Sequence, residues 1–294
     1  MRNIHLIVVA ITLLCCNYAA QADTPLWQGK GRIAISSDGN HHDHDDWAAT
    51  ALTLGLLASQ GLQDRVTLYV FSDHIWGSSR KRRKAAEQMR ISALEGKTQF
   101  GFDNTRFIEG VAEPEAAVAA MTAQIDKSTA ADPLFIVAAG PMEVVGRAIA
   151  KAKPKALAHT FVLSHSKWNN RHSDKPGDNE DHSGWTLTEI DSEFTPKGLN
   201  IVKIKNQNGG KGYDGLRAVR SKFDWVKTSP ARQHKAYKPG SWDWLYTRLE
   251  SCIKKNGTEF DPSDAGMIIY LLTGKQATEP SDARDLMENP LVRN

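Results

Sequence analysis

The residues best suited to chemistry lie in one short loop, residues 38–46, which holds four aspartates and three histidines. They are Asp38, Asp43, Asp45, Asp46, His41, His42 and His44. Carboxylates this crowded repel one another unless a cation or bound hydroxyl groups offset their charge. Oxygen ligands favour hard cations such as Ca²⁺ or Mg²⁺, whereas imidazoles favour zinc. The loop therefore predicts a metal-binding active site, because helix capping would account for one aspartate and not for four.

The elements on either side of this loop place it where α/β proteins bind ligands. A buried strand is predicted at residues 32–37, and an Ala/Leu-rich helix at residues 45–58. Further strands are predicted at residues 65–71, 106–108, 134–139, 159–164 and 200–205, and helices at residues 80–95, 113–126, 141–152, 242–254 and 263–272. This alternation indicates a single α/β domain with a mostly parallel sheet flanked by helices. Such sheets bind ligands at the carboxyl ends of their strands, where the acidic loop begins.

A second polar segment, residues 165–191, is rich in His, Asn, Asp, Gly and Trp. Long loops in compact domains are commonly functional. His165 and His182 are candidate acids that would protonate a leaving group, although a histidine in a polar loop is often simply exposed. Trp168 and Trp185 are candidates either for stacking on a base or sugar ring or for anchoring the loop to the core.

The first 22 residues have the pattern of a secretory signal peptide. Arg2 supplies a positive start, residues 6–16 are almost wholly apolar, and small residues around Gln21 form a cleavage site that ends at Ala22. The apolar run is too short to span a membrane, and no later segment is long and apolar enough. We therefore expect a periplasmic or secreted protein with one catalytic domain at residues 23–294. Cys252 remains as a lone cysteine, which excludes an internal disulfide.

The charge of the chain argues against a polyanionic partner. The full sequence has 37 basic and 34 acidic residues, a net charge of +3. The basic run at residues 80–84 lacks interleaved aromatic residues and is interpreted as a solvated helix face. We therefore expect no nucleic acid as partner, and the absence of a spanning segment likewise predicts no membrane partner.

Three motifs together resemble the inosine-uridine nucleoside hydrolase superfamily. In that family the first strand ends in a D-x-D-x-G-x-D-D type motif, and here Asp45-Asp46 matches its last two aspartates while Asp38 matches an upstream one, with extra residues between. Gly140-Pro141 lies between a predicted strand and a helix, like the family's Gly-Pro element. The segment Asp261-Pro262-Ser263-Asp264-Ala265-Gly266 opens a late helix, where the family places its last calcium ligand. The order and spacing of these motifs cover most of the chain after the leader.

The resemblance implies a mechanism as well as a fold. In that family a calcium ion holds a water molecule and sugar hydroxyl groups, and an aspartate accepts a proton as water attacks the anomeric carbon. Carried over to this sequence, it implies one Ca²⁺ per chain bound by Asp38, Asp46 and Asp264, with Asp38 also the general base. Asp45 would accept hydrogen bonds from vicinal sugar hydroxyls. Asp261 competes with Asp264 for the ligand role.

The sequence departs from the family pattern at several positions. Ser36 stands where the family usually has its first aspartate. Met142-Glu143-Val144 replaces the Leu-Thr-Asn that the family has after its Gly-Pro. The histidines inserted at positions 41, 42 and 44 are unusual. The fold and the metal site are therefore expected to carry over, while the identity of the small-molecule nucleoside or glycoside stays open. The resemblance implies a homo-oligomer, a dimer or a tetramer, although the sequence itself leaves the oligomeric state open.

The residues expected to bind substrate come from both polar segments. The family's E-F-N segment has no clear counterpart, and Asn169 and Asn170, or Asn179, are candidates to replace it. The full set of candidates is Asp45, Asn40, Asn170, Trp168 and Trp185.

Two other classes of protein remain as alternatives. The run from His42 to Asp46 matches the H-x-H-x-D part of the metallo-β-lactamase signature, which binds paired zinc ions, but Trp47 stands where that motif continues with His. A non-catalytic glycan- or nucleoside-binding module on the same fold is permitted by Ser36 and Val144. The retained aspartates argue against a pure binder, which would not need a carboxylate poised beside a water.

Overall fold

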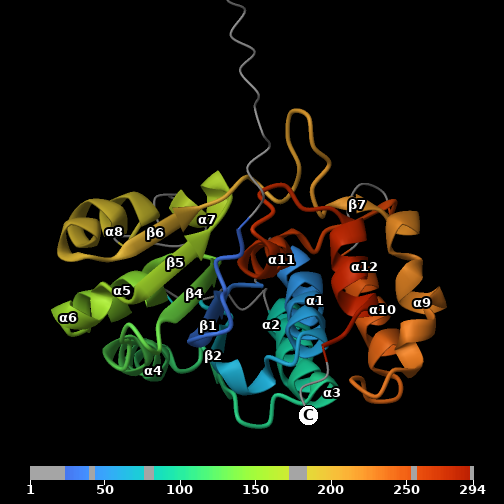
Figure 1. The fold of residues 1–294 in the computed structure, drawn as a ribbon, viewed down its shortest axis with the longest axis horizontal. Helices are drawn as coiled ribbons and strands as arrows, with labels where there is room; N and C mark the ends of the chain where they lie inside the picture. The colour runs from blue at the N-terminus through green and yellow to red at the C-terminus, as the bar shows by residue number, and fades with distance from the viewer. Residues whose placement is uncertain (1–23, 40–43, 76–82, 172–183, 253–256, 292–294) are drawn as a thin grey trace, which may run out of the picture.

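The computed structural model describes residues 24–39, 44–75, 83–171, 184–252 and 257–291, so the expected leader at residues 1–22 lies outside the described part of the chain. Six strands in that part form one sheet in the order β3-β2-β1-β4-β5-β6, and every neighbouring pair is parallel (Figure 1). The strands are β1 (Arg32–Ser37), β2 (Val66–Phe71), β3 (Arg106–Glu109), β4 (Leu134–Ala139), β5 (Thr160–Ser164) and β6 (Asn200–Lys203). The prediction of a single α/β domain with a mostly parallel sheet is confirmed.

Helices cover both faces of the sheet, which separates two apolar cores (Figure 1). One face is covered by α4 (Pro114–Asp126), α5 (Glu143–Lys151), α6 (Pro154–Leu157) and α8 (Leu187–Phe194). The other is covered by α1 (Asp45–Ser59), α2 (Arg83–Arg90), α3 (Gly96–Phe100), α10 (Ser241–Ser251), α11 (Gly266–Thr273) and α12 (Pro280–Glu288). Since both faces are covered, the central strands β1 and β4 are buried along their length and do not alternate between buried and exposed residues. All six residues of β4 are buried.

Helix α1 is the central helix of its layer, and 13 of its 15 residues are buried. It contacts α3, α10, α11 and α12, which explains its Ala- and Leu-rich sequence, because a helix surrounded by others is apolar on all sides. The rigid packing of α1 fixes the position of the acidic residues at its first turn.

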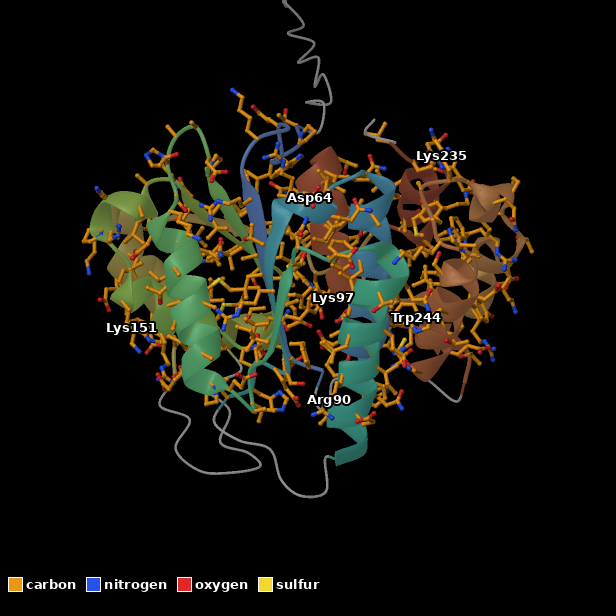
Figure 2. The ribbon with its side chains drawn as sticks, turned by 90° about the horizontal axis from the view of Figure 1, so that it is seen from below. Asp64, Arg90, Lys97, Lys151, Lys235 and Trp244 are labelled. Atoms are coloured by element: carbon orange, nitrogen blue, oxygen red, sulfur yellow. The ribbon has the colours of Figure 1, made fainter. Side chains whose placement is uncertain are left out.

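The structure differs from the predicted elements mainly at helix boundaries. The predicted helix at residues 80–95 is described from Arg83 and runs through a π-helical turn, Ile91–Glu95, into α3. Figure 2 shows this continuous rod with Arg90 and Lys97 labelled on it and Trp244 of α10 alongside. The side chains of the basic run at residues 80–84 lie outside the described residues.

The segment at residues 165–191 contains more helix than the loop prediction allowed. Residues Lys167–Arg171 form α7, and α8 begins at Leu187. Thr186 and Glu189 form a capping box at the start of α8, a Thr-x-x-Glu signal that is present in the sequence. Short connecting elements complete the chain: α9 (Trp225–Thr228) and an antiparallel pair of β7 (Ala218–Val219) and β8 (Glu259–Phe260). No helix in the described ranges has both the length and the apolar character needed to cross a membrane.

Candidate active site

Buried polar residues lie at or just beyond the carboxyl ends of three strands of the parallel sheet. Asp38 follows β1, Asp73 lies two residues beyond the end of β2, and His165 follows β5. Parallel strands end at the same edge of a sheet, so these residues meet at the edge where α/β folds bind ligands. Asp38 and Asp73 are 0% exposed and His165 is 1% exposed. Ionisable groups are rarely buried this fully, and such burial is typical of functional sites.

Two further carboxylates reach this edge from the helical layer. Asp46 lies in the first turn of α1, and its Oδ1 accepts a hydrogen bond of 2.8 Å from Ser37 Oγ. Asp264 lies in the short 3-10 turn Ser263–Ala265 that precedes α11. Burial raises the pKa of Asp46 well above its ordinary value, and the negative charges of Asp38 and Asp264 raise it further. Asp46 therefore interacts with both of the other residues predicted from the sequence as metal ligands.

Asp264 is held by two side chains from the end of β5 and the start of α7. Its Oδ1 accepts hydrogen bonds from His165 Nε2 and, at 3.2 Å, from Asn169 Nδ2. The backbone N–H of Gln207 donates to His165 Nδ1 at 3.1 Å, so Nδ1 is an acceptor and Nε2 carries the proton. Both nitrogens of the buried ring are thus occupied. These contacts favour His165 as a residue that positions Asp264, whereas its role as the acid remains a prediction.

Asp73 is a member of the site that the sequence reasoning missed. Its Oδ2 accepts a hydrogen bond of 2.6 Å from Ser36 Oγ, across the neighbouring ends of β1 and β2. Burial, together with the charge of Asp264, raises the pKa of Asp73 to about 8, although the hydrogen bond from Ser36 acts to lower it. Its position just beyond the predicted strand at residues 65–71 is the one signal that could have identified it.

Backbone strain is concentrated at the same edge. Ser72 has φ of 52° and Ser166 has φ of 69°, and they are the two non-glycine residues with positive φ in the described chain. Ser72 precedes Asp73, and Ser166 follows His165. Strained backbone of this kind persists where the surrounding structure holds it, commonly at functional sites.

A cavity of about 190 Å³ opens onto the carboxylates. It is lined by Asp45, Asp46, His165, Ser166, Trp168, Asn169, Asn208, Ser263 and Asp264. The structure therefore brings together Asp45, Trp168 and two of the predicted ligands at one opening. Of the two aspartates left open as the late ligand, Asp264 faces this cavity, while Asp261 lies beside Arg217, with 3.8 Å between Oδ2 and Nε.

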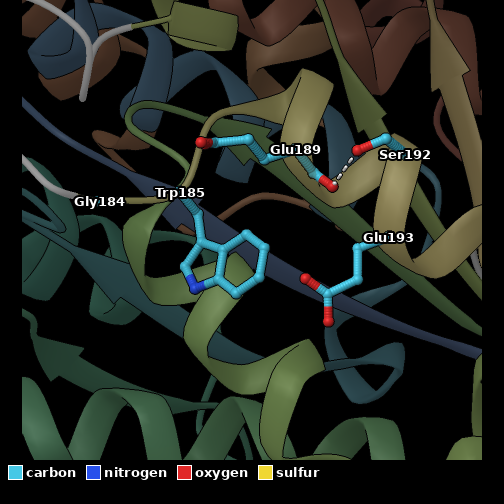
Figure 3. A pocket seen from close by; sticks show the side chains of 5 residues that line it. All are labelled: Gly184, Trp185, Glu189, Ser192 and Glu193. Atoms are coloured by element: carbon cyan, nitrogen blue, oxygen red, sulfur yellow. Dashed lines mark hydrogen bonds between the residues drawn. The ribbon is translucent and has the colours of Figure 1, made fainter.

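Other predicted substrate-binding residues lie elsewhere. Asn170 Oδ1 accepts a hydrogen bond of 2.8 Å from Ser164 Oγ, and its neighbour Asn169 takes the place on the cavity wall. Trp185 lines a separate hollow with Gly184, Glu189, Ser192 and Glu193 (Figure 3). Its ring contacts Phe194 at a centroid distance of 5.5 Å and covers Gly146, so it anchors α8 to α5.

Several predicted residues cannot be placed. Asn40, His41, His42, Asp43, Asn179 and His182 lie outside the described residues. His44 is described, and its ring lies 5.7 Å from that of Trp47, measured between centroids.

The carboxylates fit a hard cation by their chemistry but do not form a closed ligand set. Within the described ranges, no group of three or more His, Cys, Asp and Glu side chains is arranged to hold a metal ion. The donors that do gather at this edge are carboxylate oxygens, which suit Ca²⁺. Asp73 Oδ1 is buried without a hydrogen-bond partner among the described residues. Calcium binding therefore remains a proposal, with Asp38, Asp46 and Asp264 as the residues that would hold the ion.

The contacts of His165 lead to a testable distinction. If His165 positions Asp264, His165→Phe is expected to weaken calcium binding and lower kcat by about 10- to 100-fold, the usual cost of losing a residue that orients a metal ligand. The loss should be equal for a riboside and for a p-nitrophenyl glycoside, whose leaving group needs no protonation. His165→Gln, which keeps an N–H donor, is expected to recover part of it. Full activity of His165→Phe on the p-nitrophenyl substrate alone would instead identify His165 as the acid.

Comparison with known proteins gives few relatives. No protein-family model matches the chain. A protein of Formosa agariphila named "Uncharacterized protein P22" is 28% identical over 269 residues, which cover 89% of this chain and 90% of the relative. The crystal structure of an inosine-uridine preferring nucleoside hydrolase from Bacillus anthracis is similar over 88% of this chain and 99% of its own, with 8% identity and a TM-score of 0.41. A likeness this weak does not establish a function, so the functional argument rests on the residues of the site.

Proposed function

We propose that this protein is a calcium-dependent hydrolase that cleaves the N-glycosidic bond of a nucleoside or a related glycosidic bond. The observation that carries the proposal is a cluster of three buried carboxylates, with Asp38 at the end of β1 and with Asp46 and Asp264 on the wall of a cavity. Buried carboxylates this close together repel one another unless a cation balances their charge or a proton neutralises it. Buried carboxylates beside a cavity are suited to bind a hard cation and to act as a general base.

Each residue of the site has a proposed task. Asp38 accepts the proton of the attacking water. Asp45, on the cavity wall, accepts hydrogen bonds from vicinal sugar hydroxyls. His165 and Asn169 fix the carboxylate of Asp264. A bound calcium ion would supply the charge that makes a water molecule more acidic and that orients the hydroxyl groups.

The size of the cavity supports a small sugar substrate. Its volume of about 190 Å³ lies below the roughly 300 Å³ at which pockets for drug-sized ligands begin. A single sugar ring suits this space, with the rest of the ligand at the opening beside Trp168. Cleavage of the leader after Ala22 would place the enzyme in the periplasm or outside the cell, where it would act on nucleosides or other glycosides.

The proposal is tested by assaying residues 23–294 against purine and pyrimidine ribosides and p-nitrophenyl glycosides. We expect release of the base or of the nitrophenolate in calcium, loss of activity after EDTA treatment, and recovery when calcium is restored. Riboside binding without turnover would favour the binding module. If zinc restores turnover after EDTA treatment and calcium does not, the metallo-β-lactamase type of enzyme would be favoured.

The two tryptophans give a matched pair of variants. Trp168→Ala is expected to raise KM by about 10-fold or more with little change in kcat, because stacking on a base contributes roughly 1–3 kcal/mol. Trp185→Ala removes an aromatic residue of the same kind from the separate hollow, so it should lower Tm and leave KM unchanged. Steady-state kinetics of both variants provide the test. An equal rise in KM for Trp185→Ala and Trp168→Ala would contradict the placement of the substrate beside Trp168.

A further inference from the structure

The two carboxylate oxygens of Asp73 differ in their contacts, because only Oδ2 has a hydrogen-bond partner in the described part of the chain. Oδ2 accepts the hydrogen bond from Ser36 Oγ at 2.6 Å, and the backbone N–H of Asp73 donates to Ser37 O at 3.1 Å. Oδ1 is buried and has no hydrogen-bond partner in the described part of the chain. A buried carboxylate oxygen without a partner is costly, so it requires an explanation.

A purely structural role would not require a carboxylate at this position. An asparagine has the same shape, and its side-chain oxygen would accept the hydrogen bond from Ser36 without carrying a buried charge. The feature that only aspartate provides is a second oxygen, which carries negative charge when a nearby cation favours the ionised carboxylate. In the structure this second oxygen is Oδ1, the atom without a hydrogen-bond partner in the described part of the chain.

The surroundings of Oδ1 connect Asp73 with Asp38. Gly140, directly after β4, lies against both residues. A Cβ atom at position 140 would lie 2.7 Å from Asp73 Oδ1 and 2.9 Å from the backbone nitrogen of Asp38. The absence of a side chain at this position therefore lets the ends of β1, β2 and β4 approach one another. The charge of Asp264 also acts on Asp73, so Asp73 belongs to the same electrostatic cluster.

We propose that Asp73 is a further oxygen donor of the cation site, contributed by the end of β2 through its Oδ1 atom. The inference rests on the proposed function, because it assigns a residue to the calcium site proposed there. It adds a donor that lies 35 residues from Asp38 in the chain and outside the motifs of the acidic loop. With Asp73, the carboxylates of the site come from two strand ends and from the starts of α1 and α11.

The test is a calcium titration by isothermal calorimetry of residues 23–294 after EDTA treatment and its removal. Asp73→Asn, which keeps the acceptor for Ser36, is expected to weaken the Kd for calcium by about 10-fold or more. The rise in Tm on adding calcium should shrink accordingly. Ser36→Ala is the matched control, because it removes the hydrogen bond and leaves the carboxylate, and it should change the Kd much less.

The possible results separate the two proposals. If the wild type binds calcium, Asp46→Asn abolishes binding and Asp73→Asn binds like the wild type, the inference about Asp73 falls and the proposed function stands. Equal weakening by Ser36→Ala and Asp73→Asn would also overturn it, since the hydrogen bond would then be the important feature. If the wild type binds no calcium, both proposals fail.

A second variant tests the inference if Asp73→Asn does not fold. The exchanged variant S36D/D73S returns a carboxylate to the same place and is expected to bind calcium more tightly than Asp73→Ser alone. Equal Kd values for these two variants would overturn the inference.

Discussion

Asp46→Asn is expected to weaken calcium binding by about 100-fold or more, since even residues that only orient a metal ligand contribute about 10- to 100-fold. Asp46 is the carboxylate whose pKa is raised by the charges of both Asp38 and Asp264, so it lies within the influence of both. Asparagine keeps the acceptor for Ser37 Oγ and should preserve the turn at the start of α1. In the absence of metal the variant should be more stable than the wild type, because burial no longer acts on a charged group.

The measurements for Asp46 are calorimetric calcium titration and Tm with and without calcium. The neighbour Asp45 provides the control, since it lines the cavity and is only half-buried. Asp45→Asn should retain calcium affinity and raise KM for the glycoside. Calcium binding by Asp46→Asn that equals the wild type would show that the carboxylate cluster is not the metal site.

Asp38→Asn is expected to reduce kcat by about 100- to 10,000-fold, the range typical for loss of a general base. Asp38 is fully buried at the end of β1, and its Oδ1 accepts a hydrogen bond of 2.6 Å from the Gly39 N–H. Asparagine retains that acceptor, so the fold at the strand end should survive. The loss should appear in kcat more than in KM, because the base acts on the transition state.

Single-turnover kinetics at saturating calcium distinguish this role from a loss of metal. If Asp38 is only a ligand, raising the calcium concentration should restore the rate of Asp38→Asn. If Asp38 is the base, the rate stays low at every calcium concentration. A wild-type rate in the variant would remove Asp38 from the mechanism.

The sheet and the acidic loop were predictable because their signals are local. Residues 32–37 have an apolar centre and lead directly into a loop with four aspartates, and the structure places that strand at the centre of the sheet. The T-x-x-E signal at Thr186 also lies within one helical turn, although the loop prediction overlooked it. Such patterns depend on neighbours in sequence, and a sequence displays them directly.

The remaining parts of the site depend on contacts between distant segments. Asp73 joins the site because β2 pairs with β1 and Ser36 donates a hydrogen bond to it, and its place just beyond a predicted strand is the only local hint of this. The phase of α7 decides that Asn169, and not Asn170, lines the cavity. The choice between Asp261 and Asp264 likewise depends on Arg217, 44 residues before Asp261 in the chain.

The most direct test of the central claim is the metal content of the purified mature protein, measured by elemental analysis after dialysis against calcium and zinc together. We expect one calcium ion per chain in the wild type and none in Asp46→Asn. Two zinc ions per chain, or no bound metal, would contradict it.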